Sequence, residues 1–182
     1  GFGRTGTLFA SLQLRTPPDL VCLSKGLTGG FLPMGVTAVT DKILKRFDSK
    51  NPGLPFWHGH SYTANPLACA AANASLELLS SPASKRQRAR IEDLFARWVE
   101  EFSPHPKVSN ARSLGCVFAF EVRTPKPGYL SPLRDRLYDG FIRRGVLLRP
   151  LGNTVYVLPP YVITDKQLEK IRRAIDEVLD EL

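Results

Sequence analysis

The chain has 182 residues, of which 43% are hydrophobic and 23% charged, a composition typical of a globular protein with a substantial core. No apolar run approaches the roughly eighteen residues of a membrane span, so we expect neither a span nor an apolar leader. The net charge of +8 raises the possibility of a nucleic-acid binder. The main basic cluster, residues 85–90, soon turns acidic and has no interleaved aromatic residues, so we interpret it as a solvated helix face.

Residues 1–82 are rich in glycine and low in charge, with short apolar runs at residues 20–23 and 34–39. Lys25 closely follows the first run and is followed at once by a glycine-rich turn. This order presents an amine at the mouth of a sheet, where the backbone can approach a ligand closely. Lysine forms Schiff bases with carbonyl compounds when burial makes its amine nucleophilic. The alternative interpretation is a solvated loop lysine.

A helix is predicted next, over residues 65–79, because the segment is rich in alanine and suits close packing. Asn65 is its expected cap and Pro66 its first residue. The helix is expected to end at Ser80–Pro82. Just before it, Ser61 and Thr63 lie where backbone donors of a helix N-terminus favour a phosphate.

Two histidines, His58 and His60, precede this helix and could suggest a metal site. The third histidine of the chain, His105, lies in a loop between prolines, so a further ligand would have to be a carboxylate. We therefore expect no metal. The three cysteines fit no metal or redox spacing, and they indicate reduced thiols in a reducing compartment such as the cytoplasm.

Residues 83–182 show clearer periodicity and predict a small α+β domain. The order expected is a helix, a strand at 114–123, a helix after Ser131-Pro132, two short strands at 146–148 and 154–158, and a final helix. Thr164 and Gln167 form a predicted capping box for that last helix. The apolar helix faces are expected to contain Ile91, Leu94, Phe95, Trp98 and Phe102, then Leu133, Leu137, Phe141 and Ile142, then Leu168, Ile171, Ile175, Val178, Leu179 and Leu182.

One arginine of this region has a setting suited to anion binding. Arg149 follows the apolar segment 145–148 and precedes Pro150, and a guanidinium there can hold a carboxylate through two parallel hydrogen bonds. A surface ion pair is the alternative. Tyr156, on the adjoining strand, would line the same cavity or else belong to the core.

Several segments together resemble the class III pyridoxal-phosphate aminotransferases. They are residues 1–6, 23–30, 58–72, 149–153 and 156–161, and they follow the family's order from the first residue to the last helix. Within the family, the resemblance is to the branch that acts in biotin synthesis. It implies an α/β fold of the aspartate-aminotransferase type (fold type I): residues 1–82 as the end of a large, doubly wound cofactor-binding domain, and residues 83–182 as the small carboxy-terminal domain.

The resemblance also implies roles for single residues. Lys25 would bind pyridoxal 5′-phosphate covalently and then move the proton between substrate and cofactor. Ser61, with Gly59 and His60 beside it, would reach the cofactor phosphate of the neighbouring subunit, so the active sites would form at a homodimer interface. Arg149 would hold a substrate carboxylate. Tyr156 and Arg4 would line the substrate cavity.

The implied reaction transfers an amino group from S-adenosylmethionine to 8-amino-7-oxononanoate, giving 7,8-diaminononanoate. Because the chain begins inside the first matched motif, we expect it to be a carboxy-terminal fragment, inactive alone, without the family's upstream aspartate and phosphate loop. Residues 58–61 read His-Gly-His-Ser, where some members have His-Gly-Pro-Thr, and they resemble relatives in which lysine is the donor. The alternatives are therefore lysine as donor, another class III ω-aminotransferase, or a non-catalytic dimerising fragment.

Overall fold

The computed structural model describes residues 1–48, 51 and 53–182, which separate into two compact units. Unit 1 consists of Gly1–Gly3 and Thr7–Lys85, and unit 2 of Arg4–Gly6 and Arg86–Leu182. The chain thus enters unit 2 briefly at Arg4 and returns to it at Arg86. The sequence predicted a boundary between residues 82 and 83, and the roles of the two parts as domains stay a prediction.

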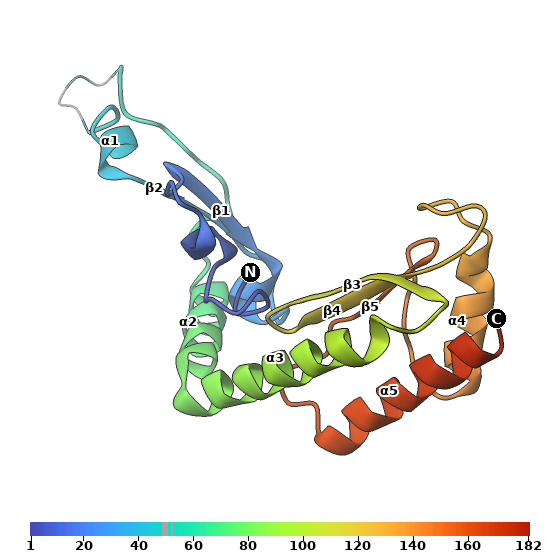
Figure 1. Ribbon diagram of the computed structural model, residues 1–182. Coiled ribbons are helices and arrows are strands. Elements are labelled where there is room, and N and C mark those ends of the chain that lie inside the picture. Colours follow the sequence, from blue (N-terminus) through green and yellow to red (C-terminus); the bar gives the residue numbers. More distant parts are fainter. Residues whose placement is uncertain (49–50, 52) are drawn as a thin grey trace. The chain divides into compact units, whose positions relative to one another are not determined.

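Unit 1 contains a two-stranded antiparallel sheet, followed in the sequence by a long helix (Figure 1). Strand β1 (Leu20–Ser24) pairs with β2 (Gly35–Val39), and short helices lie before, between and after them: η1 (Ala10–Gln13), η2 (Lys25–Thr28) and α1 (Asp41–Leu44). Among the described residues, the strands of unit 1 form only this antiparallel pair, so no doubly wound parallel sheet is present there.

Helix α2 (Pro66–Ser80) confirms the predicted cap, since the Asn65 side chain accepts hydrogen bonds from the amides of Leu67 and Ala68. Its end is also as predicted: α2 stops at Ser80, and α3 (Pro82–Phe102) starts with a proline at its first position.

Unit 2 is a three-stranded antiparallel sheet in the order β3-β4-β5, with helices α3 and α5 running along it in Figure 1. The strands are β3 (Val108–Leu114), β4 (Val117–Val122) and β5 (Thr154–Val157), and the remaining helices are α4 (Leu133–Arg143) and α5 (Asp165–Asp180). Phe118 and Phe120 of β4 are fully buried beside Phe95, Trp98 and Phe102 of α3. The α+β prediction for this part is confirmed, as is the Thr164–Gln167 capping box.

Four expectations for unit 2 were wrong. The strand expected at 114–123 starts only at Val117, after a turn at Gly115, and the preceding strand β3 was missed. β3 is the polar edge of the sheet and lacks apolar alternation. Residues 146–148 form no strand. Ile142 is 44% exposed, because the buried face of α4 is formed by Leu137, Gly140 and Phe141.

The basic stretch 85–90 was the fourth error. Arg88 is only 7% exposed, with its guanidinium 5.6 Å from the ring centre of Tyr161. Arg90 forms an ion pair with Asp165 and donates to the carbonyl of Ile163. A solvated face therefore describes only part of this stretch: residues 85, 86 and 89 are exposed, whereas Arg88 is buried and Arg90 is half-buried.

Candidate functional site

Lys25 occupies the position that the sequence suggested, directly after β1 and at the start of η2. Its backbone φ of +51° is in the left-handed region, which is uncommon for a residue other than glycine. The side chain is exposed, and among the described residues no hydrogen bond or ion pair engages its amine. The fold of unit 1 therefore leaves this amine available to a ligand.

The turn after Lys25 is held from two sides. A Cβ on Gly26 would lie 2.7 Å from the ring of Phe2, and one on Gly29 would lie 3.4 Å from Ser75 Oγ of α2. Inside the turn, Thr28 is buried and donates its hydroxyl proton to the carbonyl of Leu32 at 2.5 Å. The glycines thus bring Phe2 and α2 against the backbone that presents the lysine.

Gly59, His60 and Ser61 lie together in an exposed segment that leads into α2. The Tyr62 amide donates to Nδ1 of His60 at 3.2 Å. At the helix itself, Asn65 already accepts from two of the free amides, so those two are paired. A phosphate contact of the Ser61 hydroxyl stays a prediction.

Arg149 and Tyr156 line one cavity of about 470 Å³ in unit 2. Arg149 is exposed and Tyr156 is half-buried on β5, where it pairs with Ala119 of β4. A carboxylate entering this cavity would find a guanidinium beside an aromatic ring. The cavity is lined by Tyr129, Leu130, Ser131, Pro132, Arg134, Asp135, Arg149, Pro150, Leu151, Gly152 and Tyr156.

Arg4 belongs to unit 2, the same unit as Arg149. Its carbonyl accepts a hydrogen bond from the Cys116 amide at 2.8 Å. The neighbouring Gly115 has φ +55°, and a Cβ there would lie 2.2 Å from the Gly6 nitrogen. The turn between β3 and β4 therefore holds the segment Arg4–Gly6 against unit 2, a contact that only glycine at position 115 permits.

A small buried cluster beneath this contact has no signal in the sequence. Burial raises the pKa of the Cys116 thiol to about 11, with Glu92 adding to the rise and Arg88 and Arg4 opposing it. Burial likewise raises the pKa of Tyr161. Only the fold brings Arg88, Cys116 and Tyr161 together, since they come from α3, the β3–β4 turn and the segment before α5.

These environments predict different thiol reactivities. All three cysteines are free; Cys22 is exposed and Cys116 is buried. With a pKa of about 11, roughly one Cys116 thiol in a thousand is ionised at pH 8, and the thiolate is the reactive form. We expect iodoacetamide at pH 8 to label Cys22 of the folded chain at least tenfold faster than Cys116. Mass spectrometry of timed samples measures this, with the urea-unfolded chain as control. Equal rates in the folded chain would contradict it.

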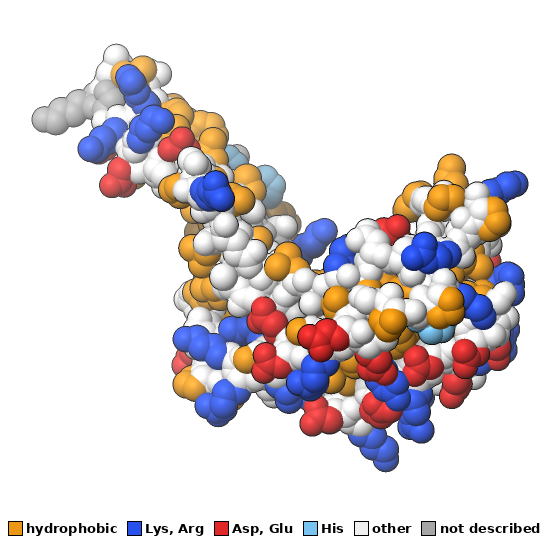
Figure 2. Space-filling model, viewed as in Figure 1, with side chains coloured by type: hydrophobic (Ala, Val, Ile, Leu, Met, Phe, Trp, Pro, Cys, Tyr) orange, Lys and Arg blue, Asp and Glu red, His pale blue; other side chains and the backbone are white. Residues whose placement is uncertain are grey.

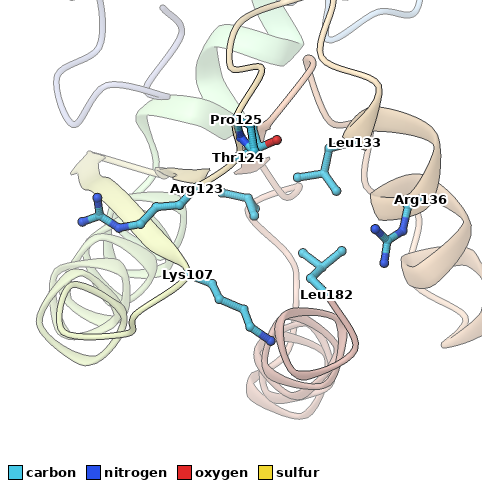
Figure 3. A pocket seen from close by; sticks show the side chains of 8 residues that line it. Lys107, Arg123, Thr124, Pro125, Leu133, Arg136 and Leu182 are labelled. Carbon is cyan, nitrogen blue, oxygen red and sulfur yellow. The ribbon is translucent and has the colours of Figure 1, made fainter.

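A second cavity of unit 2, of about 230 Å³, is shown in Figure 3. Lys107 lines it and donates to the carbonyls of Leu179 (2.7 Å) and Asp180 (3.3 Å), while Arg123 donates from Nε to Val108 O. These cations cap the end of α5 and the edge of the sheet, so we assign them a structural role.

The predicted site residues therefore divide between the units. Lys25, Gly59, His60 and Ser61 lie in unit 1, whereas Arg4, Arg149 and Tyr156 lie in unit 2. Within the described part of the chain, no group of three potential ligands could hold a metal ion. No helix among those residues is long and apolar enough to cross a membrane.

Comparisons with known proteins agree on one family. The sequence profile of the class III aminotransferases matches residues 1–179. The adenosylmethionine-8-amino-7-oxononanoate aminotransferase of Synechococcus elongatus is 50% identical over 182 residues, which are 100% of this chain and 42% of that protein. The crystal structure of the Methanocaldococcus jannaschii protein of the same name matches with a TM-score of 0.86 and 32% identity, over 100% of this chain and 44% of the other.

A further solved structure is an amine transaminase from an uncultivated Pseudomonas species in its pyridoxal-phosphate-bound form. It matches with a TM-score of 0.83 and 27% identity, over 100% of this chain and 42% of the other. The chain thus spans less than half the length of these relatives. A match along almost the whole chain nevertheless establishes its descent and its fold, and confirms the resemblance seen in the sequence. The chain belongs to the class III aminotransferases, transferases whose cofactor is pyridoxal 5′-phosphate.

Proposed function

We propose that this chain is the carboxy-terminal part of an enzyme that aminates 8-amino-7-oxononanoate to 7,8-diaminononanoate, with S-adenosylmethionine as donor. The observation that carries the proposal is the 50% identity along the entire chain to a relative named for this reaction. The cavity that contains both Arg149 and Tyr156 supports it, because the acceptor has a carboxylate to be held.

The residues of unit 1 suit pyridoxal 5′-phosphate. The cofactor is an aldehyde with a phosphate, and unit 1 has an amine without a partner among the described residues, at Lys25, and an exposed hydroxyl at Ser61. When bound, the cofactor supplies an electron sink for the carbon that loses its proton. In this proposal Lys25 Nζ holds the cofactor and then carries that proton, while Arg149 orients the substrate by its carboxylate and Tyr156 and Arg4 line its path.

The proposed partners are a second copy of the chain and small-molecule substrates. Unit 1 exposes large apolar side chains, among them Phe31 (84%), Trp57 (79%) and Tyr62 (75%), and Figure 2 shows hydrophobic atoms along this unit. Large exposed apolar side chains in this number suit burial by a partner or by further chain. Ser61, with Gly59 and His60 beside it, would then serve the neighbouring subunit's cofactor. The free cysteines support a cytoplasmic location.

The test uses the complete enzyme that contains this chain, loaded with cofactor. S-adenosylmethionine and lysine are added separately without acceptor, and the visible absorption of the bound cofactor is followed. We expect S-adenosylmethionine to discharge the absorption, and 8-amino-7-oxononanoate then to restore it with formation of diaminononanoate, detected by mass spectrometry.

Other outcomes identify the alternatives. Discharge by lysine alone would change the donor, as the His-Gly-His-Ser segment at 58–61 suggests. If neither donor discharges the absorption, the enzyme acts on another class III substrate. The likeness to an amine transaminase is the observation that supports this alternative.

A further inference from the structure

The cavity that contains Arg149 also has an apolar rim, and the proposed function assigns no role to the side chains of this rim. Tyr129 and Leu130 line it, and they are 74% and 90% exposed. The loop thus places an aromatic ring and an aliphatic side chain at the same cavity as the Arg149 guanidinium. A guanidinium with apolar groups in the same cavity suits a ligand with a carboxylate and a hydrocarbon chain.

The loop that carries these side chains is fixed by Asn153. The Asn153 side chain is buried, with the residue 4% exposed, and its Oδ1 accepts from the Gly128 amide at 2.7 Å. Its Nδ2 donates to the Val122 carbonyl at 2.9 Å. One amide group thus joins the loop to the end of strand β4. The hydrogen bond to Val122 is buried and the one to Gly128 is partly buried, so both partners are costly to leave unpaired.

Gly152 fits against the same loop. Its φ is +62°, and a Cβ there would lie 1.9 Å from the Gly128 carbonyl oxygen and 2.8 Å from the Tyr129 oxygen. The Gly128 oxygen also accepts from the Ser131 amide at 3.0 Å. Because backbone atoms rather than a flexible side chain occupy that space, any other residue at 152 must displace the loop.

We propose that Gly152 and Asn153 are positioning residues that hold Tyr129 and Leu130 as an apolar wall of the Arg149 cavity, and that this wall selects the hydrocarbon length of the bound carboxylate. The inference rests on the proposed function only in that Arg149 receives a carboxylate. Each methylene that the wall covers contributes about a fourfold gain in affinity, from about 0.8 kcal/mol per buried CH₂.

The experiment measures binding, so it needs no turnover. Pentanoate, heptanoate and nonanoate are titrated into the complete enzyme, and their Kd values are determined by NMR. We expect nonanoate to bind at least about tenfold more tightly than pentanoate, on the basis of the methylene contribution above. Asn153→Ala reduces this ratio to less than about threefold, because the loop loses both side-chain hydrogen bonds. Leu130→Ala lowers the ratio directly.

A matched pair of glycine variants separates wall placement from backbone strain. Gly152→Ala and Gly145→Ala introduce the same side chain at nearly the same φ, +62° and +65°. At Gly145, however, the close atom is Nζ at the end of the long Lys170 side chain, which donates to the Gly145 carbonyl, rather than backbone. We expect only Gly152→Ala to flatten the chain-length dependence. In the binding series, Arg149→Gln weakens all three ligands by a similar factor.

The outcomes are distinct from those for the proposed function. A wild-type enzyme without chain-length dependence, or an Asn153→Ala variant that keeps it while remaining folded by circular dichroism, overturns the inference. An enzyme that shows the dependence but does not aminate 8-amino-7-oxononanoate supports the inference and refutes the proposed function.

Discussion

Replacing Lys25 with alanine is expected to lower kcat of the complete enzyme by roughly three orders of magnitude or more, because in the proposed function one amine both holds the cofactor and transfers the proton. Lys25 is suited to both tasks by its position after β1 and by the turn that presents it. The measurement is single-turnover kinetics with the donor. In a separate sample, borohydride reduction of the wild-type enzyme without donor, followed by peptide mapping, should place the cofactor mass on the peptide with Lys25.

The matched control is Lys42→Ala. Lys42 is an exposed lysine of the same unit whose ammonium lies 3.6 Å from an Asp19 carboxylate oxygen, and removing so weak a surface ion pair should leave kcat within about twofold. Mapping of the cofactor to any other lysine, or full activity in Lys25→Ala, would refute the assignment of Lys25.

Arg149→Gln should raise KM for 8-amino-7-oxononanoate by roughly 10- to 100-fold and change kcat much less. A hydrogen bond to a charged group contributes about 1.5–3 kcal/mol, and the carboxylate is held equally in the bound substrate and in the transition state. Arg149→Lys should recover only part of this loss, because an ammonium keeps the charge but not the paired hydrogen bonds. Steady-state kinetics over a range of acceptor concentrations measures both variants.

Arg134→Gln is the control for Arg149. Arg134 lines the same cavity, but its Nη1 lies 2.7 Å from Asp135 Oδ1, so its charge is already paired. We expect its KM to stay within about threefold of the wild-type value. If the two glutamine variants behaved alike, general electrostatic attraction rather than a specific contact would explain the binding.

The division of the chain into units bears on how these residues act. Arg4 and Arg149 both belong to unit 2, and the Cys116 amide and Gly115 hold the backbone of Arg4 there. Arg4 therefore follows unit 2 although it is only four residues from the start of the chain. Its place among the substrate-cavity residues is part of the proposed function. The contacts of Gly115 and Cys116 fix only the backbone of this segment, and Arg4 is not among the residues that line the Arg149 cavity.

Local signals were sufficient for much of this protein. The start of α2 at Asn65-Pro66, the break at Ser80–Pro82 and the capping box of α5 depend on residues close together in sequence, and the structure confirms each of them. The buried stripe of α3 also follows from helical spacing alone. The order of several short motifs is sufficient to indicate the family, and the placement of Lys25 after a strand required only its neighbours.

Tertiary structure decided what depends on residues far apart in the chain. The polar strand β3 exists because β4 offers it an edge to pair with, and Arg88 is buried where the fold brings Cys116 and Tyr161 against it. The glycines at 115 and 152 resemble ordinary turn residues in the sequence, yet each accommodates a backbone from elsewhere in unit 2. Sequence by itself thus determined the elements and the chemistry of single residues, whereas the close approach of distant backbones formed the Arg149 cavity, since such contacts leave no periodic pattern in the chain.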